Sequence, residues 1–128
     1  MEKFKRLPDS ELDIMLVIWE AKEPVSRAYI EQQIKKKKKI AATTVLTLLS
    51  RLCDKGFVSC EKKGNMNLYT AIVNDQDYKN SESRSIIKKL YGNSLKTFVA
   101  SFCMDNKISD DQLNELQAFL DQLKERRK

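Results

Sequence analysis

Residues 43–57, TTVLTLLSRLCDKGF, predict an amphipathic helix that ends at Gly56. Its apolar residues recur at helical spacing and predict a buried stripe of Val45, Leu48, Leu49 and Leu52. The opposite face carries short hydroxyl groups and one basic group, on Thr43, Thr44, Thr47, Ser50 and Arg51. Such a face suits the major groove of DNA, because hydroxyl groups approach base edges and phosphates closely and an arginine extends beyond them. The alternative is an ordinary core helix with a solvated polar face.

Two more helices are predicted before this segment. The first begins at Asp9 or Ser10 and carries a broad apolar stripe. The second covers residues 27–35, with Ser26 as its N-cap. Five consecutive lysines, residues 35–39, connect it to the candidate recognition helix. A run of like charges is usually a solvated turn, but its place before this helix favours contact with phosphates.

Two alternating segments follow Gly56, at residues 58–62 and 68–72, and predict the strands of a hairpin. Residues 63–67 are expected to form the turn between them. Three helices followed by a hairpin is the order of a winged helix-turn-helix, in which the third helix enters the major groove. The predicted tip can contact the DNA backbone or a minor groove through Lys62, Lys63, Asn65 and Asn67. A plain hairpin that only closes a small core is the alternative.

The second half of the chain predicts three further helices. Asn74 or Asp75 caps the first, which runs to about Tyr91 and is interrupted at Gly92 and Asn93. A short, strongly apolar helix follows at residues 95–103. The last helix begins after Ser109, Asp110 and Asp111 and repeats leucine at Leu113, Leu116, Leu120 and Leu123.

These helices are too few and too short to bury their apolar stripes by themselves. We therefore expect them to pair with a second copy of the chain, through Tyr91, Leu95, Phe98, Val99, Phe102, Leu113, Leu116 and Leu120. Packing of the same helices on the first half of the chain is the alternative. The expected organisation is a winged-helix DNA-binding domain at residues 1–73 and a helical dimerisation domain at residues 74–128.

The distribution of charge agrees with this division. The chain has 128 residues and a net charge of +6. Residues 1–73 carry 14 basic against 9 acidic side chains, whereas residues 74–128 carry 10 against 9. The basic excess therefore lies in the half that holds the candidate recognition helix, as expected for a surface that binds nucleic acid.

Composition also restricts the chemistry available to the chain. It contains no histidine, which removes Ser-His-Asp and Cys-His catalysis and disfavours transition-metal sites. Cys53, Cys60 and Cys103 are scattered, without the spacing of metal ligands. We expect no enzymatic activity, no metal and no cofactor.

The location expected from the sequence is the cytoplasm. No apolar run approaches the roughly 20 residues of a membrane span. Residues 1–11 lack the apolar segment of a signal peptide. Three scattered cysteines, an odd number, are typical of a reducing compartment.

From residue 7 to residue 123 the chain resembles the BlaI/MecI family of penicillinase repressors. The resemblance rests on separate motifs: LPDSELDIMLVIWE from residue 7, residues 43–57, LYTAIV from residue 68, and SDDQLNELQAFL from residue 109. The most specific is LYGNSLKTFVASF, residues 90–102, in which Tyr91-Gly92-Asn93-Ser94-Leu95 leads to Val99 and Phe102.

This resemblance implies a homodimeric, cytoplasmic transcriptional repressor that binds operators of dyad symmetry. The genes implied are those of β-lactamases or related antibiotic-resistance proteins, together with an operon for a membrane sensor-protease. It also implies relief of repression by cleavage in the C-terminal part, before a conserved Phe. The corresponding bond is Ser101–Phe102, where Ser replaces the Asn common in the family.

The family's pattern of residues in the recognition helix is only partly kept in this chain. Thr44, Thr47 and Arg51 match the family by position, whereas Thr43 and Leu46 stand where basic residues are common. Leu46 either contacts a thymine methyl group or is packed in the protein. Either the operator then differs from the usual one, or affinity depends more on the lysine run.

Two other classes of function stay open. A winged helix can serve as a protein-interaction adaptor without binding DNA, although the Thr/Arg face and the nearby lysines speak against this. A carboxylate-dependent enzyme, such as a metal-ion nuclease, would need acidic residues that converge in a cleft. The acidic residues are better explained as helix caps and solvated faces: Asp9, Glu11, Asp13, Glu20, Glu23, Asp110 and Asp111.

Overall fold

The computed structural model describes residues 6–105 and 107–127. The chain divides into two compact units, an N-terminal unit of Met1–Ser83 and a C-terminal unit of Arg84–Lys128. The boundary between the units lies within helix α4 (Asp75–Tyr91), beyond the boundary at residue 73 that the sequence predicts.

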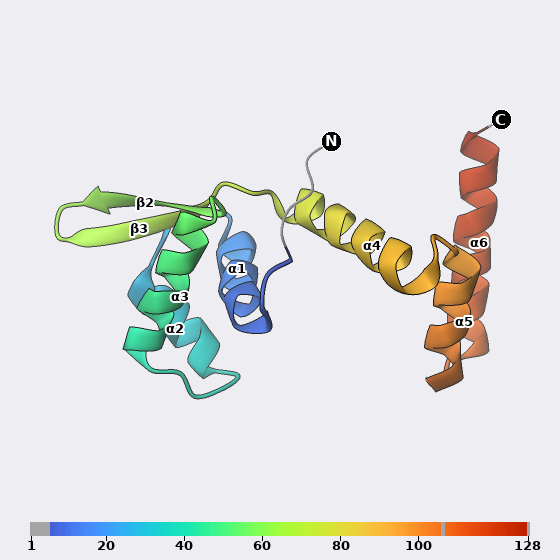
Figure 1. Ribbon diagram of the computed structural model, residues 1–128, viewed down its shortest axis with the longest axis horizontal. Coiled ribbons are helices and arrows are strands. Elements are labelled where there is room, and N and C mark those ends of the chain that lie inside the picture. Colours follow the sequence, from blue (N-terminus) through green and yellow to red (C-terminus); the bar gives the residue numbers. More distant parts are fainter. Residues whose placement is uncertain (1–5, 106, 128) are drawn as a thin grey trace. The chain divides into compact units, whose positions relative to one another are not determined.

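Short helices beside a β-hairpin make up the N-terminal unit (Figure 1). They are α1 (Asp9–Ala21), α2 (Arg27–Lys35) and α3 (Ala42–Asp54), followed by strands β2 (Val58–Lys63) and β3 (Met66–Ala71). A short strand, β1 (Val25–Ser26), pairs with β3, so the order in the antiparallel sheet is β1-β3-β2. The predicted winged helix-turn-helix and the mainly helical fold class are confirmed, while β1 was not predicted.

Local signals in the sequence set the ends of α2 and α3. The Ser26 hydroxyl accepts a hydrogen bond from the Tyr29 N–H at 3.1 Å and caps α2. At the end of α3 the chain reverses through Gly56, whose φ of 81° favours glycine. The Phe57 N–H then donates to the Leu52 carbonyl at 2.9 Å, which satisfies an acceptor at the helix end.

A single apolar core joins the three helices to the base of the hairpin. It contains Ile14, Met15, Ile18, Ile30, Ile34, Val45, Leu48, Leu49, Leu52, Phe57, Val58 and Tyr69. The four α3 residues in this core are those that the helical spacing predicts. Since full burial of an aliphatic side chain contributes about 1.5–3 kcal/mol, the core fixes the orientation of α3.

The hairpin turn is tighter than the sequence analysis predicts. The strands pair up to Lys63 and Met66, so Gly64 and Asn65 alone form the loop, and the predicted turn over residues 63–67 is wrong. Gly64 has a φ of 61°, as the first loop position of a type II′ turn requires. Met66 and Asn67 therefore belong to β3 and lie beside the tip.

Tyr78, near the start of α4, attaches this helix to the N-terminal unit. Its hydroxyl accepts a hydrogen bond from the buried Leu7 N–H at 2.9 Å. The Tyr78 ring packs on Phe57 and Trp19, with centroid distances of 5.7 and 5.8 Å. Trp19 Nε1 also donates to the Val73 carbonyl at 2.9 Å. These long-range contacts extend the compact unit beyond residue 73.

Beyond residue 83, the C-terminal unit consists of the rest of α4, then α5 (Leu95–Asp105) and α6 (Asp110–Arg126). Between α4 and α5 the chain turns at Gly92 and Asn93, whose φ angles are 54° and 64°. Ser109 and Gln112 form a reciprocal capping box at the start of α6. The predicted helices of the second half are thereby confirmed. Within the described ranges, no helix has the length and apolar character of a membrane span.

Candidate nucleic-acid interface

The hydroxyl and basic residues of α3 lie on its exposed face, opposite the buried stripe. This face comprises Thr43, Thr44, Thr47, Ser50 and Arg51. The Thr47 hydroxyl donates to the backbone oxygen of Thr43 at 3.0 Å. Its proton is therefore held within the helix, while the hydroxyl oxygen stays able to accept. The structure thus presents the residues predicted for recognition on one solvated surface.

Arg51 has no acidic partner in the described part of the chain. Its guanidinium group is therefore free to donate two parallel hydrogen bonds to a guanine edge or to a phosphate. Arg51 lies in the last turn of α3, where a positive charge also interacts favourably with the helix dipole.

The N-terminus of α3 is open. Ala41 occupies the N-cap position and provides no side-chain hydrogen bond to the first turn. The N–H groups of that turn are consequently available, and the helix dipole favours an anion there. In a helix that enters the major groove, this end is suited to contact a backbone phosphate.

The hairpin, or wing, adds a second charged surface. Lys62, Lys63 and Asn65 are exposed at its tip. Neither lysine has an ion-pair partner among the residues that the structure describes. Their ammonium groups are therefore available to phosphates, in keeping with the role that the sequence predicts.

A groove of about 540 Å³ lies among the start of α2, Leu46 of α3 and the wing. It is lined by Ser26, Arg27, Ala28, Leu46, Lys63, Asn65, Met66, Asn67 and Tyr69. The lining contains two basic side chains and no acidic one. Tyr69 is one of the lining residues, and burial raises the pKa of its phenol.

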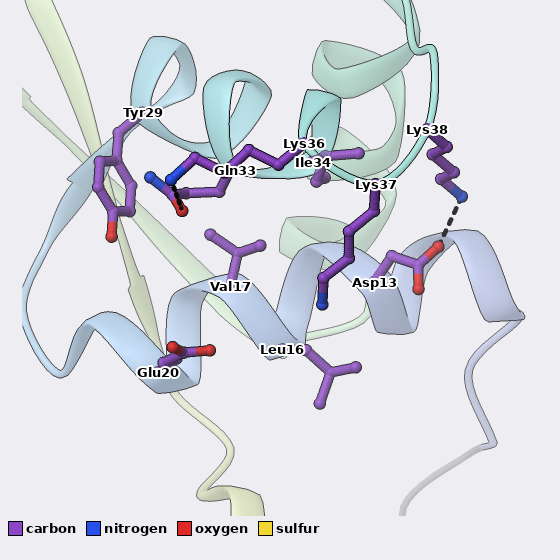
Figure 2. Close-up of a pocket in the computed structure, with 10 residues that line it drawn as sticks. All are labelled: Asp13, Leu16, Val17, Glu20, Tyr29, Gln33, Ile34, Lys36, Lys37 and Lys38. Atoms are coloured by element: carbon purple, nitrogen blue, oxygen red, sulfur yellow. Dashed lines mark hydrogen bonds and ion pairs between the residues drawn. The ribbon is translucent and has the colours of Figure 1, made fainter.

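The lysine run is more engaged with the protein than the sequence predicts. Lys38 forms an ion pair with Asp13 of α1, with Nζ and Oδ2 at 2.6 Å (Figure 2). Lys36 Nζ donates to Gln33 Oε1 at 3.2 Å. Lys36, Lys37 and Lys38 line a hollow of about 300 Å³ together with residues of α1 and α2. Figure 2 shows these side chains. Part of the lysine charge therefore faces α1.

Lys35 is also paired, with Glu31 one helical turn earlier at 2.9 Å. The hydrogen bond from Lys35 lowers the pKa of Glu31, and the nearby Arg27 acts in the same direction. Lys36, Lys37 and Lys39 have no acidic partner within the described residues. The contribution of the run to phosphate binding thus depends chiefly on these three side chains.

The structure corrects the prediction that Glu11 is a cap or a solvated residue. Its side chain is 2% exposed, and its carboxylate pairs with Lys55 Nζ at 2.5 Å. Lys55 follows directly after α3, so this pair ties the end of α3 to α1. Because Glu11 and Lys55 are 44 residues apart, no local pattern in the sequence predicts that they pair.

The residues expected to form the dimer interface are largely uncovered. Leu95, Phe98, Val99, Phe102, Leu113, Leu116 and Leu120 are between 36% and 68% exposed. Tyr91 is half-buried, and its ring meets Phe98 edge-on with a centroid distance of 5.3 Å. Phe119, on α6, is exposed as well. Apolar residues in such number on α5 and α6 are typical of an interface with another chain.

The Ser101–Phe102 bond lies within α5. Phe102 is exposed and Ser101 is half-buried. A protease binds its substrate in extended form, so cleavage here requires local unwinding of α5.

In the part of the chain that the structure describes, no three or more Cys, Asp or Glu side chains come together in a way that could hold a metal ion. Cys53, Cys60 and Cys103 are free thiols. Burial raises the pKa of the Cys53 thiol, which makes it a poorer nucleophile.

Comparison with known proteins agrees with this geometry. The "Penicillinase repressor" of Bacillus licheniformis is 29% identical over 128 residues, covering 100% of this chain and 99% of the relative. The "Methicillin resistance regulatory protein MecI" of Staphylococcus aureus (strain N315) is 29% identical over 118 residues, covering 92% of this chain and 95% of the relative.

A solved structure matches part of the chain. It is the solution structure of Bacillus licheniformis BlaI, in its monomeric form, in complex with the blaP half-operator. The TM-score is 0.52 at 29% identity, over 61% of this chain and 94% of that one. The family model described as "Penicillinase repressor" matches residues 7–122. The chain therefore belongs to the penicillinase repressor family.

Proposed function

We propose that this chain represses transcription as a homodimer that binds an operator of dyad symmetry. The observation that carries the proposal is the orientation of α3. Its apolar stripe is buried in the core, and its Thr/Arg face is exposed beside a basic wing. Membership of the penicillinase repressor family supports the same function. In this family the chain binds DNA and is not an enzyme.

In this proposal α3 enters the major groove. Thr43, Thr44, Thr47 and Arg51 then face base edges and phosphates. Lys62, Lys63 and Asn65 lie along the backbone or an adjacent minor groove and add affinity that does not depend on sequence. The open N-terminus of α3 and the unpaired Lys37 and Lys39 provide further phosphate contacts.

Dimerisation follows from the exposed apolar faces of the C-terminal unit. One N-terminal unit presents one recognition helix, which suits one half-site. In support, the relative BlaI was solved as a monomeric form on a half-operator. Pairing of two chains through α5 and α6 would provide two recognition helices, which together demand a symmetric operator.

Regulation is proposed by analogy with the relatives. The names of these proteins refer to penicillinase and methicillin resistance, which supports a target among antibiotic-resistance genes. A membrane sensor-protease pathway would then relieve repression by cleaving at Ser101–Phe102 in the cytoplasm. Cutting α5 would separate apolar residues that belong to one interface and so would weaken the dimer.

An adaptor function is less well supported. A surface that docks a protein usually has an apolar centre with few charges. The exposed face of α3 instead carries four hydroxyl groups and an arginine, with Leu46 as the one exposed apolar residue at its flank. This composition favours nucleic acid.

In vitro selection from a random DNA duplex library tests the proposal with the full-length chain. The expected result is an enriched dyad, with half-sites about one helical turn or a multiple of it apart, roughly 10 bp centre to centre. Its affinity should fall steeply with salt. Absence of any enriched duplex at low salt would refute DNA recognition. Enrichment of an asymmetric single site would refute the dimer.

A further inference from the structure

Leu46 is an exposed apolar residue of α3. Its side chain is 46% exposed. The four core residues of α3, which are Val45, Leu48, Leu49 and Leu52, are at most 4% exposed. Leu46 is therefore not part of the core, and packing does not explain it. It lies on the flank of the exposed face that borders the wing.

Met66, on β3, lines the same groove and is 55% exposed. Apart from Ala28, the remaining lining is polar or basic, with Arg27 paired to Glu31 and Lys63 unpaired among the described residues. Two exposed apolar side chains, together with the unpaired ammonium group of Lys63 and no acidic lining residue, fit an occupant that is anionic at its edge and apolar within. One strand of a DNA duplex has this chemistry, since its phosphates are outside and its sugars and base edges inside.

A thymine C5-methyl group is the apolar feature that base pairs display in the major groove. It projects near the backbone of its own strand, which is where a residue on the wing-side flank of α3 would meet it. We propose that Leu46 is a specificity-determining residue that contacts a thymine methyl group on the strand held between α3 and the wing. Met66 forms the opposite wall, against a deoxyribose. This inference rests on the proposed DNA-binding function.

The test uses the duplex selected by the full-length chain. Each thymine is replaced in turn by deoxyuridine, which lacks only the methyl group, and affinity is measured by fluorescence anisotropy. We expect one thymine in each half-site at which the replacement weakens binding about fourfold. This is the effect expected from losing one buried methyl group. In the Leu46→Ala variant, the same replacement should change affinity by less than about 1.5-fold.

Leu16→Ala is the matched control, because Leu16 is 44% exposed and lies on α1, outside the groove. This variant should retain the full deoxyuridine effect. If deoxyuridine is neutral at every position, or if its effect is the same in Leu46→Ala as in the unchanged chain, the inference is overturned while DNA binding stands. If the chain selects no duplex, the proposed function fails and the inference fails with it.

Discussion

Replacing Leu116 by Ala should weaken the dimer by a predictable amount. Leu116 lies on the uncovered face of α6 and is 40% exposed. Full burial of a leucine contributes about 1.5–3 kcal/mol, so covering the exposed part contributes about 1 kcal/mol. A two-fold interface contains each residue twice, which gives about 2 kcal/mol per dimer. The dimer dissociation constant should therefore rise about 30-fold.

Sedimentation equilibrium of the full-length chain measures this constant. Leu16→Ala again serves as the control, because Leu16 is exposed to a similar degree but lies in the N-terminal unit. Its dimer constant should stay within about twofold of the unchanged chain. If Leu116→Ala leaves the constant unchanged, or if both variants shift it equally, then α6 does not form the interface and the reasoning from exposure is wrong.

Further predictions concern stability, recognition and induction. Tyr78→Phe leaves the buried Leu7 N–H without its acceptor and should lower the free energy of unfolding by about 1–3 kcal/mol in urea titrations; an unchanged value would contradict the assigned hydrogen bond. Because burial raises the pKa of Tyr78 above its ordinary value of 10.0, the folded protein should lose stability as pH rises above about 10, and Tyr78→Phe should show a smaller loss. Parallel stability curves for the two proteins would exclude this contribution. Arg51→Ala should weaken binding to the selected duplex by about 1–3 kcal/mol and relax its sequence preference, whereas Lys62→Ala should weaken binding to all duplexes alike and reduce the salt slope by about 1. A chain truncated after Ser101 should be monomeric by sedimentation; dimerisation as tight as that of the intact chain would defeat induction by cleavage at Ser101–Phe102.

Local signals made much of the fold predictable. Ser26 caps α2 and Ser109 with Gln112 caps α6, and both helices begin where these residues place them. The helical spacing of Val45, Leu48, Leu49 and Leu52 identified the buried side of α3 and hence its exposed face. Such features depend on neighbours within one turn, which the sequence displays directly.

Features that depend on distant partners were missed. Strand β1 has two residues and exists because Val25 and Ser26 pair with Tyr69 and Leu68. The N-terminal unit extends into α4 because Tyr78 reaches Leu7, 71 residues away. Neither pairing leaves a local pattern, so no periodicity could predict it.

In the candidate site, too, local features were predictable and contacts between distant residues were not. Arg51 and the wing lysines are exposed, as their place in the pattern predicts. The pairing of Lys35 with Glu31 was readable from their spacing of four residues, but that of Lys38 with Asp13 was not. The predicted phosphate-binding role of the lysine run therefore rests on fewer free charges than the sequence indicated.

The central claim is that two chains, joined through α5 and α6, present two α3 helices to one symmetric operator. Native mass spectrometry of the full-length chain with the selected dyad duplex tests this most directly. We expect a complex of two chains per duplex, and a marked loss of affinity when one half-site is scrambled. A complex of one chain per duplex, bound equally well by the intact dyad and by a single half-site, would contradict the account.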